Sequence, residues 1–131
     1  MARPLTTAGV SFWTVEAAVG PAYDGIMSHN YAAQRRETFD TFRQSRGVKL
    51  PERAVVDFAF FVEETDADWA GFERTLRSKG FRSRRLGDGE TVIASIGPIA
   101  VTAEEIWRWE ELATGIALAF DFYPDGWELD L

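Results

Sequence analysis

The strongest strand pattern of the chain runs from Arg53 to Glu63, where nearly every residue is hydrophobic. Successive side chains of a strand point to opposite faces of a sheet, so this stretch presents two sets of side chains. Both sets are largely apolar: Val56, Phe58, Phe60 and Val62 on one face, and Val55, Asp57, Ala59 and Phe61 on the other. A strand that is apolar on both faces is typical of the middle of a sheet, and we therefore predict a central strand here.

Three other stretches repeat their apolar residues at helical spacing, and we predict helices over residues 31–45, 66–79 and 102–118. Each has, at or just before its start, a side chain that can accept a hydrogen bond from the first turn. The expected caps are Asn30 or Ser28, Thr65, and Thr102. The last helix has the clearest start, because Thr102 and Glu105 form a capping box.

Three further strands are predicted around these helices, at residues 81–86, 91–96 and 119–123. The short turn Gly87-Asp88-Gly89 makes the first two antiparallel neighbours, and Gly97-Pro98 is expected to end or bulge the second. The order after residue 53 is then β-α-β-β-α-β. It predicts an α+β, ferredoxin-like fold, with a four-stranded antiparallel sheet, two helices on one face, and the N-terminal helix in addition.

The chain is expected to form a single domain over residues 29–131, preceded by an uncertain N-terminal extension at residues 1–28. Within the extension, Ser11–Val19 predicts a short strand or a helical turn. Two interpretations of the extension stay open. Either translation starts at Met27, or Phe12-Trp13 docks on the domain as an extra element.

The composition supports one domain and narrows the range of partners. The chain has 131 residues, 46% of them apolar, which is enough for a single core. Its formal net charge of −7 repels phosphate groups, so we expect no direct nucleic-acid binding and favour a basic protein partner. It has no cysteine, no apolar run near the roughly 18 residues of a membrane span, and no signal-peptide pattern. We therefore expect a cytoplasmic protein that does not bind membranes.

No group of residues forms a recognisable catalytic centre, so we predict no catalytic, metal-binding or cofactor-binding residues. The single histidine, His29, cannot by itself build a histidine-rich metal site or a catalytic triad, and a loop or capping position is expected for it. Most carboxylates lie at helix starts or on polar helix faces, where acidic residues are common. Asp57 differs, because it lies inside the central strand. It faces solvent, pairs with an arginine such as Arg84, or marks a functional surface.

A basic group and an aromatic tail are the two remaining local features. The basic group is expected to be a solvated sheet edge that resists strand-to-strand aggregation, because strand 91–96 has no aromatic residue on which RNA bases could stack. Its members are Arg74, Arg77, Lys79, Arg82, Arg84 and Arg85. In the tail, Asp125-Gly126 predicts a tight turn. Trp127 beside it either folds back on the core or, with Tyr123, forms an exposed anchor for a partner protein.

Several features of this chain occur in a fixed order between about Gln34 and Leu129. They are a leading helix with Arg36-Glu37-Thr38, the strand VDFAFFVE, a helix ending in Lys79-Gly80-Phe81, a T-x-E-x-I helix opening at Thr102, and the closing Asp125-Gly126-Trp127. In this order they resemble the regulator of ribonuclease E activity B family, and the closing motif is the most specific of them. The chain departs from the family at Pro124, where the family has tyrosine, and at Glu128, where glycine is common.

The resemblance implies a ferredoxin-like domain that binds endoribonuclease E, whose noncatalytic part carries arginine-rich segments, and lowers its cleavage of RNA. Our leading hypothesis is thus a bacterial, non-catalytic regulator of RNA decay that needs no cofactor. Its predicted partner-binding residues are Tyr123, Asp125, Gly126, Trp127 and Asp57. Two alternatives stay open. One is a small carboxylate-dependent enzyme or metal-binding domain built on Asp57, Asp121 and Asp125, and the other is a module that forms a homodimer through the open sheet face.

Overall fold

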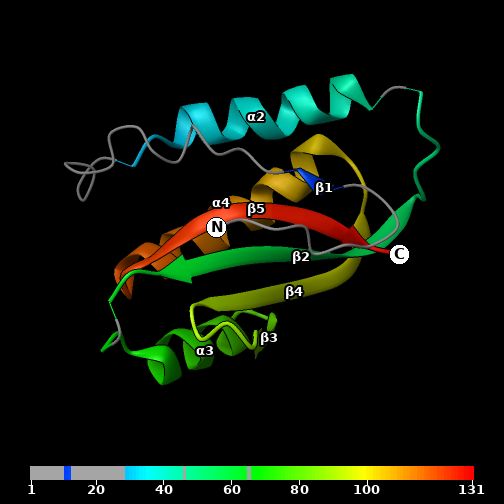
Figure 1. Cartoon of the computed structure of the whole chain (residues 1–131). Coiled ribbons are helices and arrows are strands. Elements are labelled where there is room, and N and C mark those ends of the chain that lie inside the picture. Colours follow the sequence, from blue (N-terminus) through cyan, green and yellow to red (C-terminus); the bar gives the residue numbers. More distant parts are fainter. Residues whose placement is uncertain (1–10, 13–28, 46, 65) are drawn as a thin grey trace.

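The computed structural model describes residues 11–12, 29–45, 47–64 and 66–131. This part of the chain forms one antiparallel sheet and three helices (Figure 1). In chain order the elements are β1 (Ser11–Phe12), α2 (Tyr31–Gln44), β2 (Arg53–Val62), α3 (Trp69–Ser78), β3 (Arg82–Arg85), β4 (Thr91–Ala100), α4 (Ala103–Ala119) and β5 (Phe122–Asp130). The predicted α+β class is confirmed.

β2 lies in the middle of the sheet, as its apolar faces predict. The strand order is β1-β5-β2-β4-β3, and every neighbouring pair is antiparallel. The arginine-rich β3 therefore lies at one edge, also as predicted. At the other edge, Ser11 and Phe12 form a two-residue strand beside β5, so the sheet has one strand more than the expected four. Trp13 and Met27 lie outside the described residues, and the later translation start stays untested.

The core lies between one face of the sheet and the helices. Phe58 and Phe60 of β2 are each 1% exposed and pack in one apolar cluster with Phe72 of α3. α2 lies on the same side of the sheet, because its Phe42 packs against this cluster and stacks on Trp127 of β5. Figure 1 shows α4 between α2 and α3, behind the sheet. None of the helices in the described ranges is both long and apolar enough to cross a bilayer.

α3 begins three residues later than predicted. The Asp68 side chain accepts a 2.9 Å hydrogen bond from the backbone N–H of Gly71, so Asp68 is the cap and Trp69 is the first helical residue. The predicted cap Thr65 lies outside the described residues. Aspartate is as good a cap as threonine, so the chemistry of the cap does not decide between residues 65 and 68.

β4 continues past Gly97-Pro98 to Ala100, so the bulge, rather than the end of the strand, is confirmed. The pairing with β2 shifts register between Ala54 and Val56, opposite this point. Gly97 has a φ of 123°, and a Cβ atom there would lie 2.9 Å from the carbonyl oxygen of Ala54. Only glycine fits so close to the neighbouring strand, and β4 continues beyond this bulge.

The tail differs most from its prediction. α4 extends to Ala119 and β5 starts only at Phe122, so the predicted tight turn at Asp125-Gly126 lies inside a strand and is wrong. The pairing between β2 and β5 shifts register between Phe58 and Phe60, and Gly126, with a φ of 105°, lies in this bulge. An Asp-Gly pair suits both a turn and a bulge, because both need a backbone conformation that glycine allows.

Candidate functional site

Trp127, in the most specific motif of the sequence, is a core residue. Its side chain is 3% exposed, and its ring stacks on Phe42 with 6.0 Å between centroids. Its Nε1 donates a 3.2 Å hydrogen bond to Oγ1 of Thr38 on α2. The structure thus shows the alternative in which Trp127 folds back on the core. Whether it also binds a partner stays a prediction.

Thr38 belongs to a buried polar network where α2 meets α4. Its Oγ1 donates a 2.6 Å hydrogen bond to Oε1 of Glu110. Gln34, one turn earlier on α2, donates from Nε2 to Oε2 of Glu110 (3.1 Å) and to Oγ1 of Thr114 (3.0 Å). We call these four residues the polar seam. Its hydrogen bonds join residues of two helices that are more than 70 positions apart in sequence.

Glu110 is the titratable group of the polar seam. Burial raises the pKa of this carboxyl to about 7, and the negative charge of Glu37 adds to the shift. The hydrogen bonds from Thr38 and Gln34 oppose it, because they favour the ionised form. Near neutral pH the carboxyl is therefore divided between its protonated and ionised forms, and proton binding is linked to the packing of α2 on α4.

His29 borders the polar seam from the chain segment before α2. Its Nε2 lies 2.7 Å from Oε1 of Gln34, and its ring meets Tyr31 edge-on, with 4.7 Å between centroids. The next residue, Asn30, is the cap of α2 and accepts a 2.9 Å hydrogen bond from the N–H of Ala33. His29 thus has the loop position that the sequence predicted, and it holds Gln34 in place.

Asp57 lies on the sheet face opposite the helices and is 4% exposed. Oγ of Ser95 on β4 donates a 2.5 Å hydrogen bond to its Oδ1, and Glu128 of β5 is its cross-strand neighbour on the other side. Burial raises the pKa of Asp57, while the hydrogen bond from Ser95 and the positive charge of Arg84 counteract the shift. At this low exposure Asp57 does not face solvent, so that alternative is wrong. Its hydrogen-bond partner is Ser95, and the predicted pairing with Arg84 stays a prediction. A role in partner binding stays a prediction.

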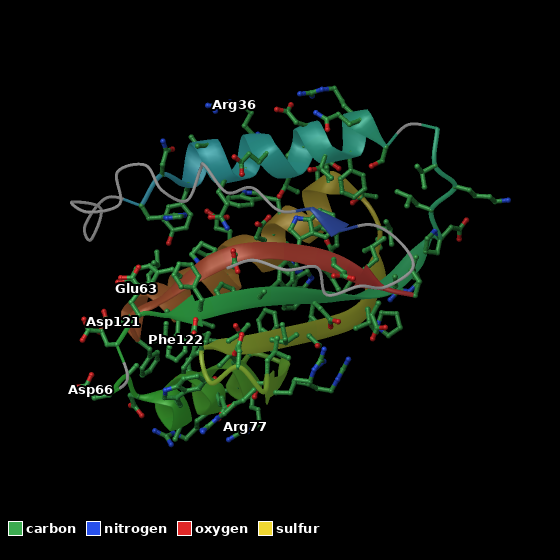
Figure 2. The ribbon with its side chains drawn as sticks, in the orientation of Figure 1. Arg36, Glu63, Asp66, Arg77, Asp121 and Phe122 are labelled. Carbon is green, nitrogen blue, oxygen red and sulfur yellow. The ribbon has the colours of Figure 1, made fainter. Side chains whose placement is uncertain are left out.

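Tyr123 lies on the same face, where β2 ends and β5 begins. It pairs across the strands with Phe61, with 5.6 Å between the ring centroids, and both side chains are half-buried. Glu63, Glu64 and Asp121 are exposed beside this pair, and Figure 2 shows Glu63 and Asp121 together at this end of the sheet. Burial and then the charges of Asp121, Glu63 and Glu64 raise the pKa of Tyr123. We call these five residues the acidic aromatic end.

Asp121 reaches this position through an unusual backbone conformation. Its φ is 66°, which is the left-handed region that few residues other than glycine adopt. Aspartate and asparagine tolerate this region better than other side chains. The conformation ends α4 and starts β5 within two residues, and Phe122 then pairs with Val62. The carboxylate of Asp121 is thereby brought to the strand end that carries Glu63.

The predicted partner-binding residues do not form one patch. Asp57 and Tyr123 lie on the face opposite the helices, Trp127 packs on the helix side, and Asp125 and Gly126 are half-buried in the bulge between them. Of the five, Tyr123 lies beside the exposed carboxylates of Glu63, Glu64 and Asp121.

Two carboxylates of the alternative enzyme hypothesis, Asp57 and Asp121, lie far apart. Asp57 lies five residues before Val62, the partner of Phe122, so roughly 16 Å of strand separates it from the end that carries Asp121. Within the described ranges, no group of three or more histidine, aspartate and glutamate side chains is arranged to hold a metal ion.

Sequence patterns pointed to neither the polar seam nor the acidic aromatic end. A signal for the seam was present, because Glu110 falls four residues after Ile106 and three before Ala113, within the buried stripe of α4. A carboxylate on such a stripe predicts buried hydrogen-bond partners. The acidic aromatic end gave no local signal, because Glu63 and Asp121 meet only through the pairing of β2 with β5.

The sequence model of a known family, described as Regulator of ribonuclease activity B, matches residues 32–129. The chain belongs to this family. The family's role is regulation of ribonuclease activity, which is a regulatory role rather than a catalytic one. The matched span contains both the polar seam and the acidic aromatic end. Among curated proteins, none matches the chain in sequence.

Proposed function

We propose that this protein is a non-catalytic regulator of an endoribonuclease of the ribonuclease E type, and that it slows RNA degradation by contacting the nuclease. The observation that carries the proposal is the family match, which runs from the first turn of α2 almost to the end of β5. The family supplies the regulatory role. Direct contact with the nuclease, and a place in the cytoplasm beside it, are our inferences.

The charge of the protein supports contact with the nuclease rather than with its substrate. The net charge is −7, and RNA is a polyanion. A negatively charged domain is repelled by RNA and attracted to basic protein segments, which raises the rate of association with the nuclease. The arginine-rich segments expected in the nuclease from the family resemblance are matching partners.

A pull-down with ribonuclease E from the same cell, followed by an RNA cleavage assay, tests the proposal. We expect the full chain to retain the nuclease at low salt and to lower the cleavage rate, and added salt to weaken both effects, because exposed charges are screened. Failure to bind at low salt would refute the proposal. Light scattering of the free chain separately tests the homodimer through the open sheet face.

A further inference from the structure

We propose that the acidic aromatic end is the surface that receives the partner, and that it binds an extended, arginine-rich segment. This inference rests on the proposed function, because it names the surface and the chemistry of the same contact. Phe61 and Tyr123 would receive guanidinium groups on their ring faces, while Glu63, Glu64 and Asp121 would pair with them at the rim.

The register of the sheet places rings and carboxylates side by side. Phe61 pairs directly with Tyr123, and Val62 pairs with Phe122, so the residues that follow β2 and precede β5 lie next to each other. Glu63 and Asp121 occupy these positions, and both are exposed. The result is a half-buried apolar patch with negative charge along one side, at the end of the face that no helix of the described structure covers.

The electrostatics of this end favour a positively charged partner. The three charged side chains that raise the pKa of Tyr123 are all carboxylates, and each favours the neutral phenol over the phenolate. The same three charges would stabilise a cation placed against the ring. Several carboxylates in a row match a segment with several positive charges better than a single lysine.

Elsewhere in the structure, one arginine is held by an aromatic ring and a carboxylate together. The guanidinium of Arg85 lies 5.1 Å from the ring centroid of Trp69 and donates to Glu73, at 3.0 Å from Nη2 to Oε1 and 3.2 Å from Nε to Oε2. One ring and one carboxylate thus hold one arginine. The acidic aromatic end presents the same two kinds of group, and no arginine of the described residues is among the charges that act on Tyr123.

Arginine is favoured over lysine because the two parts of the surface use different features of its side chain. The planar guanidinium stacks on aromatic rings and forms forked hydrogen bonds to carboxylates, whereas the lysine ammonium is a compact, strongly hydrated charge. A higher affinity for arginine than for lysine peptides therefore measures the contribution of the rings. The salt dependence of the affinity measures the contribution of the carboxylates.

The first test removes the charges and keeps the fold. The variant E63Q/E64Q/D121N replaces three exposed carboxylates, and asparagine accepts the left-handed backbone of residue 121. The matched control E52Q/E90Q/E104Q removes three exposed carboxylates elsewhere. The probes are fluorescent nona-arginine and nona-lysine, titrated by anisotropy against the full chain. We expect the first variant to bind nona-arginine about tenfold more weakly and the control to bind it like wild type.

The second test removes the rings and keeps their apolar character. F61L/Y123L, checked for folding by circular dichroism, should reduce the preference for nona-arginine over nona-lysine. Equal affinity of wild type and the charge variant for nona-arginine would overturn the proposal, and so would a control that loses as much affinity as the charge variant. Binding of a single-stranded RNA oligonucleotide that the charge variant weakens would overturn it in favour of a nucleic-acid surface.

The nuclease pull-down separates failure of this surface from failure of the proposed function. If wild type does not bind ribonuclease E, the proposed function is wrong, regardless of the affinities measured for nona-arginine and nona-lysine. If wild type binds and inhibits the nuclease and the charge variant does so equally well, the function stands and the acidic aromatic end is the wrong surface.

Discussion

Helix α4 makes two contacts of opposite chemical character. Toward the sheet, Ile106, Ala113 and Ala117 are fully buried in the apolar cluster. Toward α2, Glu110 and Thr114 enter the hydrogen bonds of the polar seam. Apolar burial stabilises many arrangements of similar volume, whereas a buried polar network is favourable in one arrangement only. The sheet contact is therefore the apolar anchor of α4, and the seam positions α2 together with Phe42, which packs on the core.

The largest effect is expected from breaking the apolar contact. Ile106→Ala deletes buried methyl groups and leaves a cavity, and it should lower the free energy of unfolding by about 2–5 kcal/mol. Urea denaturation followed by tryptophan fluorescence measures this change. Leu112 on the same helix is 37% exposed, and Leu112→Ala should stay within about 0.5 kcal/mol of wild type. Equal losses in the two variants would show that the apolar contact is not what holds α4.

The polar seam is expected to make stability depend on pH. The pKa of Glu110 is about 7 in the folded chain and near 4.5 in the unfolded one, so between these values the folded state keeps a proton that the unfolded state has lost. The contribution of this carboxyl to the free energy of unfolding is therefore fully present below about pH 4.5 and is lost as the pH rises to about 7, by up to about 3 kcal/mol. Glu110→Gln cannot lose this proton and should flatten the fall.

Urea denaturation at a series of pH values between 4 and 8 checks the slope. Asp57 also has a raised pKa, and its contribution has the same sign, so wild type and variant are compared at every pH. Glu111→Gln removes the exposed carboxylate next to Glu110 and should keep the wild-type slope. A Glu110→Gln profile parallel to wild type would show that Glu110 stays ionised in the seam.

The smallest effect is expected from one hydrogen bond of the seam. Thr114→Val keeps the shape of a fully buried side chain and removes the hydroxyl that accepts from Gln34. We expect a loss of about 1 kcal/mol, because Gln34 keeps Glu110 as its other acceptor. Thermal unfolding followed by circular dichroism measures it. A variant as stable as wild type would mean that this hydrogen bond contributes nothing net.

The two contacts of α4 also differ in how well sequence predicts them. Helical spacing and the capping box placed the start of α4, and Oγ1 of Thr102 does accept a 3.1 Å hydrogen bond from the N–H of Glu105. The apolar side chains on both faces of β2 placed it at the centre of the sheet. These signals are local, since they depend on residues within a few positions of one another.

For contacts between distant segments, a local signal can mark one residue but does not identify its partner. In the polar seam, Thr38 of α2 binds Glu110 of α4, and no pattern in the sequence of one helix indicates its partner in the other. The tail was mispredicted because Asp125-Gly126 suits a turn as well as a bulge, and only the pairing of β5 with β2 decides between them. The acidic aromatic end likewise exists only once β2 and β5 are paired.

The left-handed backbone at Asp121 limits how this corner of the protein can evolve. Aspartate, asparagine and glycine adopt that conformation cheaply, whereas a lysine or arginine there would cost about 1–2 kcal/mol. Substitution at this position can therefore remove a negative charge with little damage to the fold, but reversing the sign carries a conformational penalty. Relatives with a different partner are expected to neutralise this position before they make it basic.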